Sequence, residues 1–309
     1  MKVFTHNFNP SSNSGPNKFT RTLFNQLIKD GKVSLSNQEE ADVEFCLIQQ
    51  QSHKVKPMVL RLDGIWFNSE QDYDSQNAPI VFSYNNADAV VFQSEFNKKL
   101  TEKWFGPHRN SYVIHNAPDI NLIRSANSRY WNTKFGKDTE VWSCASSWRP
   151  HKRLNCNIKY FLEYAPQEAI FAIAGGIGMD EAKEIMLKDK RIYILGELDY
   201  MSLLALYKRS SKFIHLAYLD HCPNVVVDAQ ASGCHIVCSS SGGTKEIVSD
   251  GTVINEDKWD YRPTKLYKPP VLDYENSSVI YSVQCEENRN NIVKCAEKYY
   301  DVLAGVTDA

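Results

Sequence analysis

The sequence lacks any long apolar run, and this excludes a membrane-spanning helix. No stretch of the 309 residues approaches the roughly 20 consecutive apolar residues that a bilayer-spanning helix needs. The first residues, MKVFTHNFNP, also lack the apolar centre of a secretory signal peptide. We therefore expect a cytoplasmic protein with no transmembrane segment, and peripheral contact with a membrane stays open.

The sequence also lacks a basic tract and a cysteine framework. Its 35 Lys and Arg balance 37 Asp and Glu, so no polybasic surface for nucleic acid is expected. The eight cysteines are dispersed, and Cys46, Cys144 and Cys238 lie in apolar segments, as reduced core thiols do. Cys234 and Cys238 have no CxxC or HxxxH partner nearby, so no metal site is expected.

Apolar strands alternate with amphipathic helical segments in two successive series. This alternation predicts an α/β protein with parallel sheets covered by helices and ligands at the carboxyl ends of the strands. We expect strands at 3–5, 43–48, 58–62, 89–93 and 112–115, then at 141–145, 170–174, 192–195, 213–219 and 235–238. Helices are expected at 17–29 and 95–105, then at 154–164, 180–187, 201–209 and 224–232.

The two series predict two domains. The first covers residues 1–125 and the second residues 139–283, with an aperiodic linker between them. Residues 259–274 are expected to be irregular. A terminal helix is expected at 284–305, where apolar residues recur at helical spacing.

The segment from Asp220 to Val248 places two carboxylates on either side of a helix start. Asp220 follows the expected strand 213–219, so its carboxylate should emerge at the strand's carboxyl end. Pro223 and Asn224 open the next helix, whose free amide groups and dipole favour an anion. Asp228 lies about one turn further along, where a carboxylate can accept the hydroxyls of a ribose. An ordinary strand-helix-strand unit with solvated acids fits this spacing equally well.

A second candidate site is the loop SSWRPHKRLN, residues 146–155. Arg149 and Lys152 extend from a strand-to-helix connection, where paired cations can neutralise a diphosphate. A solvated basic loop is the simpler interpretation of this pattern by itself.

These motifs together resemble the C-terminal signature of the retaining family 4 glycosyltransferases, also called glycosyl transferases group 1. In that family two acids separated by seven residues precede a small-residue helix, a strand and a Gly-Gly turn before Glu, here Gly242, Gly243 and Glu246. The family usually has Glu at both acid positions, whereas this chain has the shorter Asp220 and Asp228. The resemblance implies the GT-B fold, in which two Rossmann-like domains face a cleft, here with an abbreviated N-terminal domain and a terminal helix that crosses back to it.

The resemblance also implies roles for individual residues. Lys152, with Arg149 as a chemical substitute for the family's arginine, would contact the donor diphosphate, and Asp220 would contact the donor sugar. Asp228 would bind the ribose. Asp63, after the expected strand 58–62, is a candidate for the acceptor side. The remaining donor-binding candidates are Gly15, Gly175, Gly176, Glu197, Leu198, Asn224, Val225, Gly242 and Gly243.

The function implied is a retaining, metal-independent glycosyltransferase without a cofactor. It would transfer a hexose-like sugar from a nucleoside-diphosphate donor to a saccharide or lipid-linked acceptor, and its oligomeric state stays open. One alternative is a non-catalytic sugar- or nucleotide-binding protein that keeps the fold. A second is a metal-dependent GT-A enzyme, because Asp72-Tyr73-Asp74 spells DxD, although no apolar strand precedes it. A GT-B epimerase is a third, but the acids and histidines that it needs form no recognisable pattern.

Overall fold

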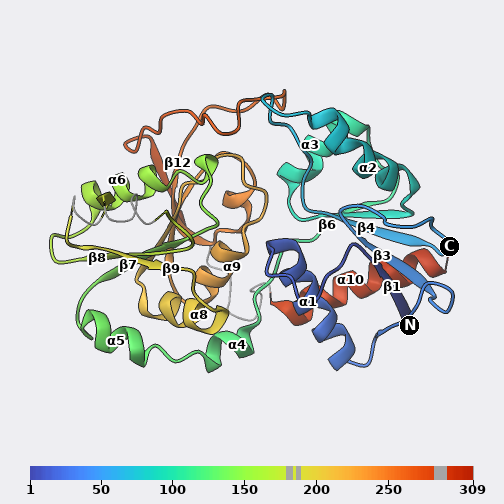
Figure 1. Ribbon diagram of the computed structural model, residues 1–309, viewed down its shortest axis with the longest axis horizontal. Coiled ribbons are helices and arrows are strands. Elements are labelled where there is room, and N and C mark those ends of the chain that lie inside the picture. Colours follow the sequence, from blue (N-terminus) through green and yellow to red (C-terminus); the bar gives the residue numbers. More distant parts are fainter. Residues whose placement is uncertain (179–183, 186–188, 282–290, 309) are drawn as a thin grey trace.

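Two β-sheets, each covered by helices on both faces, lie side by side in the computed structural model (Figure 1). The structure describes residues 1–178, 184–185, 189–281 and 291–308. We call the half built on the first sheet lobe 1 and the half built on the second sheet lobe 2. No helix in these described ranges is long and apolar enough to cross a membrane.

The sheet of lobe 1 is parallel throughout, with the strand order β2-β1-β3-β4-β5-β6. Its strands are β1 (Lys2–His6), β2 (Ser34–Leu35), β3 (Val43–Leu47), β4 (Met58–Leu62), β5 (Ala89–Phe92) and β6 (Ser111–Val113). β3, β4 and β5 are buried along their whole length, which explains why they appear in the sequence as continuous apolar runs. Four helices cover this sheet, namely α1 (Gly15–Lys29), α2 (Tyr73–Asn86), α3 (Glu95–Phe105) and α10 (Ile292–Thr307).

The sheet of lobe 2 has the order β13-β12-β11-β10-β7-β8-β9, and only β13 is antiparallel to its neighbour. Its strands are β7 (Val141–Ala145), β8 (Ile170–Ala174), β9 (Ile192–Gly196), β10 (Lys212–His215), β11 (His235–Ser239), β12 (Asp250–Ile254) and β13 (Ser277–Tyr281). One face packs against α4 (Ile120–Ser125), α5 (Arg129–Phe135), α8 (Tyr200–Arg209) and α9 (Asn224–Ala231). The other face packs against α6 (Leu154–Tyr164).

The C-terminal helix α10 belongs to the core of lobe 1, although it follows lobe 2 in the sequence. It lies beside α1 in Figure 1 and packs against α1, β3 and β4. Tyr299 is fully buried there between the rings of Phe19 and Phe45 and accepts a hydrogen bond of 3.1 Å from the Nε of Arg61. The domain boundaries at 125, 139 and 283 stay predictions, and residues 284–290 of the expected terminal helix lie outside the described ranges.

The expected strand 213–219 is too long, since β10 ends at His215. Residues 216–219 remain buried but turn away from the ladder: the amide of Tyr218 donates to the carbonyl of His151, and Leu219 takes a left-handed conformation with φ 55°. The apolar run therefore marks a buried loop as well as a strand, a distinction that periodicity does not make.

Three α-helices in the described ranges were not expected, namely α2, α4 and α5. Residues 125–139, interpreted as an aperiodic linker, contain α5, which buries Trp131 and Phe135, two rings one helical turn apart. The polar stretch around Asp72 begins α2, whose first turn is capped because the Asp72 carboxylate accepts from the amide of Ser75. The expected helix 180–187 lies outside the described ranges except for residues 184 and 185.

The long segment 255–276 contains no helix or strand, as expected for 259–274, and crosses from lobe 2 to lobe 1 and back. It is the orange trace at the top of Figure 1, and we call it the crossing segment. On lobe 1, Thr264 exchanges backbone hydrogen bonds with Phe67 and Ser69, and the Trp104 indole donates to the carbonyl of Tyr261 at 2.8 Å. It therefore ties the two lobes together.

We predict that Tyr299→Ala lowers the free energy of unfolding by about 3–5 kcal/mol, the usual cost of truncating a fully buried ring. Urea unfolding followed by tryptophan fluorescence measures the change. Tyr300→Ala, at the half-buried next position, is the matched control and should cost less than about 1 kcal/mol. Equal losses for the two variants would contradict the packing of α10 described above.

Candidate active site

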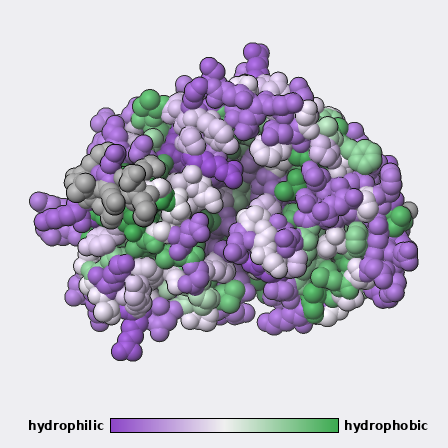
Figure 2. All heavy atoms as spheres, viewed as in Figure 1, coloured by the Kyte–Doolittle hydropathy of each residue, from purple (hydrophilic) through white to green (hydrophobic). Residues whose placement is uncertain are grey.

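The candidate site lies between the lobes, where Figure 2 shows a hollow surrounded by hydrophilic residues. Asp220 reaches it from the loop after β10, and its mostly buried carboxylate, with 14% of the side chain exposed, is held on three sides. Lys152 Nζ lies 2.6 Å and His215 Nε2 2.9 Å from its Oδ2, while the amide of His221 donates to Oδ1 at 3.0 Å. Burial opposes ionisation, but Lys152 and His215 outweigh it and hold the pKa of Asp220 well below its ordinary value. Asp220 is therefore an anion at neutral pH.

The Gly-Gly turn contacts the backbone of Asp220. Gly243 N donates to the Asp220 carbonyl at 2.8 Å, and Gly242 forms an isolated bridge with Asp220. A Cβ at Gly242 would lie 2.4 Å from that carbonyl, and φ is 78° there, so only glycine fits. The structure thus gives Gly242 and Gly243 a clear role in backbone packing; their contact with a donor stays a prediction.

The loop after β7 brings one of its two expected cations to Asp220. Lys152 ends the short helix η1 (Pro150–Lys152) and makes the contact described above. The side chain of Arg149 is exposed and forms no hydrogen bond with any residue in the described ranges. It therefore lies beside the site without being fixed there.

Sequence reasoning missed the neighbouring Arg153, which is buried. Its guanidinium pairs with both carboxylate oxygens of Glu256 at 2.9 and 2.7 Å and donates to the carbonyl of Pro270 at 2.8 Å. These contacts fix the base of the loop that carries Lys152. The partner is 103 residues away, so no local pattern could have revealed it.

Asp228, on α9, is buried and contacts two partly buried residues that sequence reasoning also missed. The Tyr200 hydroxyl donates to Asp228 Oδ2 at 3.1 Å, and Lys18 Nζ lies 3.8 Å from the same oxygen. Burial raises the pKa of Asp228 to about 6, against the opposing effect of Lys18, and burial lowers the pKa of Lys18. Because Lys18 comes from α1, this cluster joins the two lobes.

The start of α9 contacts lobe 1 through Asn224. Its side chain donates to the carbonyl of Gly15 at 3.0 Å and accepts from Asn116 Nδ2 at 2.8 Å. Within the described ranges the amides of Asn224 and Val225 have no hydrogen-bond acceptor, so they remain available to an anion at the positive end of the helix.

The remaining donor-binding candidates follow strands β8 and β9, and none of them contacts Asp220 or Lys152 in the described ranges. Gly175 packs closely against the backbone of Ser146, and Gly176 faces the side chain of Glu197. Glu197 is exposed after β9, and the half-buried Leu198 packs against the core of lobe 2. Their roles in donor binding stay predictions.

Asp63 is paired with the buried Arg61, which also donates to Asn116 Oδ1 at 2.8 Å. This pairing supports a structural role for Asp63 in lobe 1, and its acceptor-side role stays a prediction.

Another interlobe contact involves Glu246 of the Gly-Gly motif. Its carboxylate accepts from the first two amides of α3, Glu95 N at 2.7 Å and Phe96 N at 2.8 Å. A carboxylate at this end of a helix is favoured by the helix dipole.

The described residues contain no group of three His, Cys, Asp or Glu side chains arranged to hold a metal ion. Asp72 caps α2 and Asp74 lies in its exposed first turn, so the DxD sequence has a local structural explanation.

Residues 131–260 match the family model Glycosyl transferases group 1, which covers the loop of Lys152 and both acids. No curated protein sequence matches the chain significantly.

Solved structures match along nearly the whole chain at low identity. Anabaena HepE in complex with UDP-glucose superposes with a TM-score of 0.64 at 14% identity, covering 100% of this chain and 97% of that one. The sucrose-phosphate synthase of Thermosynechococcus elongatus gives 0.69 at 11%, covering 99% and 96%. WaaG, a glycosyltransferase of lipopolysaccharide biosynthesis, gives 0.67 at 12%, covering 99% and 100%.

These matches confirm the expected GT-B architecture of two facing Rossmann-like sheets, and that fold excludes the GT-A alternative. Residues 131–260, with the two acids and the Lys152 loop, form a Glycosyl transferases group 1 domain, and the chain is a glycosyltransferase with the GT-B fold.

Proposed function

We propose that the protein is a retaining, metal-independent glycosyltransferase that transfers a sugar from a nucleoside diphosphate to a saccharide acceptor. The observation that carries this proposal is the cluster of Lys152, Asp220 and His215 beside the start of α9. It combines a fixed cation, a fixed anion and free amides in one cleft. Retention of configuration rests on the family resemblance alone.

The donor diphosphate is best placed between Lys152 and the start of α9. Breaking the bond between the anomeric carbon and the diphosphate leaves the bonding electrons on the phosphate oxygen. Lys152 and the amides of Asn224 and Val225 can stabilise that charge without reorganising, because packing already fixes them. Arg149 is exposed at the same loop and can move to add a second cation.

Asp220 is suited to hold the donor sugar. It is ionised, and its Oδ1 accepts from only one group, the amide of His221, within the described ranges. A carboxylate oxygen has capacity for further donors, so sugar hydroxyls can bind there. His215 can donate to Asp220 while neutral, because burial lowers the pKa of His215.

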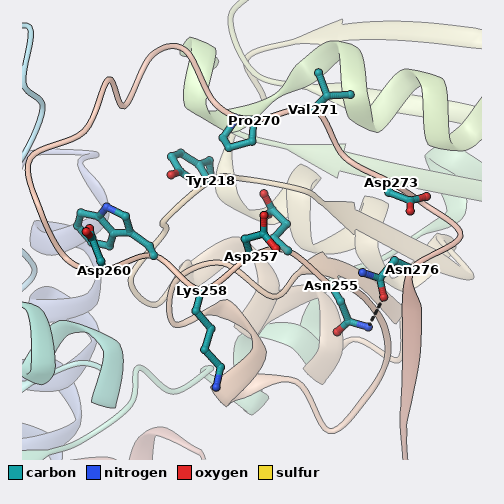
Figure 3. A pocket seen from close by; sticks show the side chains of 11 residues that line it. Tyr218, Asn255, Asp257, Lys258, Asp260, Pro270, Val271, Asp273 and Asn276 are labelled. Carbon is teal, nitrogen blue, oxygen red and sulfur yellow. Dashed lines mark hydrogen bonds between the residues drawn. The ribbon is translucent and has the colours of Figure 1, made fainter.

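The acceptor class is supported by a cavity of about 480 Å³ between the crossing segment and lobe 2 (Figure 3). Carboxylates, two amides and two aromatic rings line it, and Lys258 extends away from the other labelled side chains. Such a lining suits hydroxyl groups and disfavours an anionic acceptor. The full lining is Tyr218, Asn255, Glu256, Asp257, Lys258, Trp259, Asp260, Pro270, Val271, Asp273 and Asn276.

The cavity also adjoins the donor site. Tyr218 lies two residues before Asp220, and Glu256 holds Arg153, the neighbour of Lys152. A saccharide whose reacting end lies at Asp220 can therefore extend toward this cavity.

A cytoplasmic location stays a prediction. Each of the seven cysteines in the described ranges is unpaired, which agrees with a reducing compartment.

The first test of this proposal is single-turnover sugar transfer in EDTA. We expect wild-type activity to persist, because the charge stabilisation is assigned to Lys152 and helix-start amides. Lys152→Ala should raise the barrier by about 2.7–4 kcal/mol, comparable with losing one oxyanion donor. Asp72→Ala is the control and should leave the rate unchanged, since it only caps α2. Abolition of transfer by EDTA would contradict the metal-independent assignment, and absence of turnover with every donor would favour the non-catalytic binding alternative.

A second test concerns the ribose and pH. In wild type a ribonucleoside diphosphate should bind more tightly than its 2′,3′-dideoxy analogue, and Asp228→Ala should remove most of this difference, roughly tenfold or more. Because the pKa of Asp228 is raised to about 6, the wild-type preference should fall as pH decreases through 6. Calorimetry of both ligands with both proteins measures this. A preference that survives in Asp228→Ala would remove Asp228 from the ribose site.

A third test concerns the acceptor cavity. Asp257 is exposed at its centre, so Asp257→Ala should raise the acceptor KM roughly tenfold or more by removing hydrogen bonds to a charged group. The acceptor is the neutral oligosaccharide selected by screening a panel for transfer. Donor affinity should not change, and Asp301→Ala on the exposed side of α10 is the matched control. An unchanged acceptor KM in Asp257→Ala would place the acceptor elsewhere.

A further inference from the structure

The space next to Asp228 is filled by side chains from both lobes. The cavity that remains there has a volume of about 10 Å³, close to the minimum for a single water molecule and far below that of a ribose. It is lined by Lys18, Phe19, Thr22, Ala117, Asp119, Tyr200, Asn224 and Asp228. With the lobes in this arrangement, a ribose can reach Asp228 only if one of these side chains moves.

Lys18 is the lining residue that directly engages the Asp228 carboxylate from lobe 1. Its ammonium lies 3.3 Å from the centre of the Tyr200 ring and 3.8 Å from Asp228 Oδ2. The Tyr200 hydroxyl donates to that same oxygen, so the Tyr200 ring and the Asp228 carboxylate together form a binding site for a cation, which we call the seat. Both residues of the seat belong to lobe 2, whereas Lys18, which fills it, belongs to lobe 1.

The first turns of α1 are held in this position by a separate contact. Asn224 Nδ2 donates to the carbonyl of Gly15, the first residue of α1, and Lys18 lies three residues further along the helix. Lys18 is mostly buried, with 21% of its side chain exposed, and Arg21 on the same helix adds repulsion. Asp228 therefore provides the main compensating charge for this ammonium.

We propose that Lys18 competes with the donor ribose for Asp228, so that nucleotide entry requires Lys18 to leave its seat. This inference rests on the proposed ribose role of Asp228. Seating of Lys18 and binding of the donor then exclude each other, and the apparent donor affinity is reduced by the fraction of molecules with Lys18 seated. Lys18 would thus weaken donor binding, the opposite of what a cation that contacts the diphosphate would do.

Lysine footprinting without any nucleotide tests the seat itself. Acetic anhydride should modify Lys18 several-fold more slowly than Lys29, which is exposed at the end of the same helix. Asp228→Asn should accelerate modification of Lys18. Asp119→Asn is the matched control, because Asp119 lines the same cavity and asparagine can still cap α4. An unchanged Lys18 rate in Asp228→Asn would overturn the proposal.

Calorimetry with UDP, GDP, ADP and dTDP tests the competition. Lys18→Met removes the charge and should tighten binding of the preferred nucleotide about two- to fivefold, the range expected for a partly exposed ion pair. Lys29→Met, the same substitution at an exposed position, should not change the affinity.

Each outcome separates this inference from the proposed function. Tighter binding in Lys18→Met supports the competition, whereas unchanged or weaker binding overturns it and leaves the glycosyltransferase proposal intact. Failure of wild type and variant alike to bind any of the four nucleotides would overturn the proposed donor site and this inference together.

Discussion

The site depends on a mostly buried carboxylate that must remain ionised. Asp220 lies at the carboxyl edge of the lobe 2 sheet, where its charge is acceptable only because Lys152, His215 and a backbone amide surround it. Its backbone carbonyl in turn fixes Gly243. Two segments far apart in the sequence, that of Lys152 and that of residues 215–221, therefore meet because one anion has to be compensated, and the same compensation places a cation next to the start of α9.

The lobes are joined by polar contacts from the sequence motifs of the candidate site. Glu246, three residues after the Gly-Gly turn, caps α3, and Asn224 at the start of α9 contacts both Gly15 and Asn116. The crossing segment adds backbone hydrogen bonds to lobe 1 through Tyr261 and Thr264. Residues next to the proposed donor site thus also determine how lobe 1 faces lobe 2.

Much of the fold could be predicted from the sequence because its central strands are buried on both faces. The strands at 58–62, 141–145 and 170–174 and the helices at 95–105 and 154–164 have the expected bounds, since apolar runs and amphipathic periods there are bounded by polar residues. The end of β10 could not be predicted, because a buried loop and a buried strand have the same composition. The short helix α5 forms because Trp131 and Phe135 pack into the hydrophobic core of lobe 2, and only the tertiary structure reveals this packing.

The candidate site was predictable where local chain geometry determines it. Asp220 and Lys152 both follow parallel strands of one sheet, and the carboxyl ends of such strands share an edge, so their meeting could be anticipated. Lys18, Tyr200 and Arg153 were missed because each acts through a partner in a distant segment or in the other lobe. Nothing in the spacing of these residues signals such a contact.

The central claim is that the cleft holds a nucleoside diphosphate between Lys152, the start of α9 and Asp228. A crystal structure with the nucleoside diphosphate that most raises the melting temperature tests it most directly. We predict phosphate oxygens within hydrogen-bond distance of Lys152 Nζ and of the amides of Asn224 and Val225, with the ribose hydroxyls on Asp228. A nucleotide bound away from Lys152, or a diphosphate held through a metal ion on Asp72 and Asp74, would contradict it.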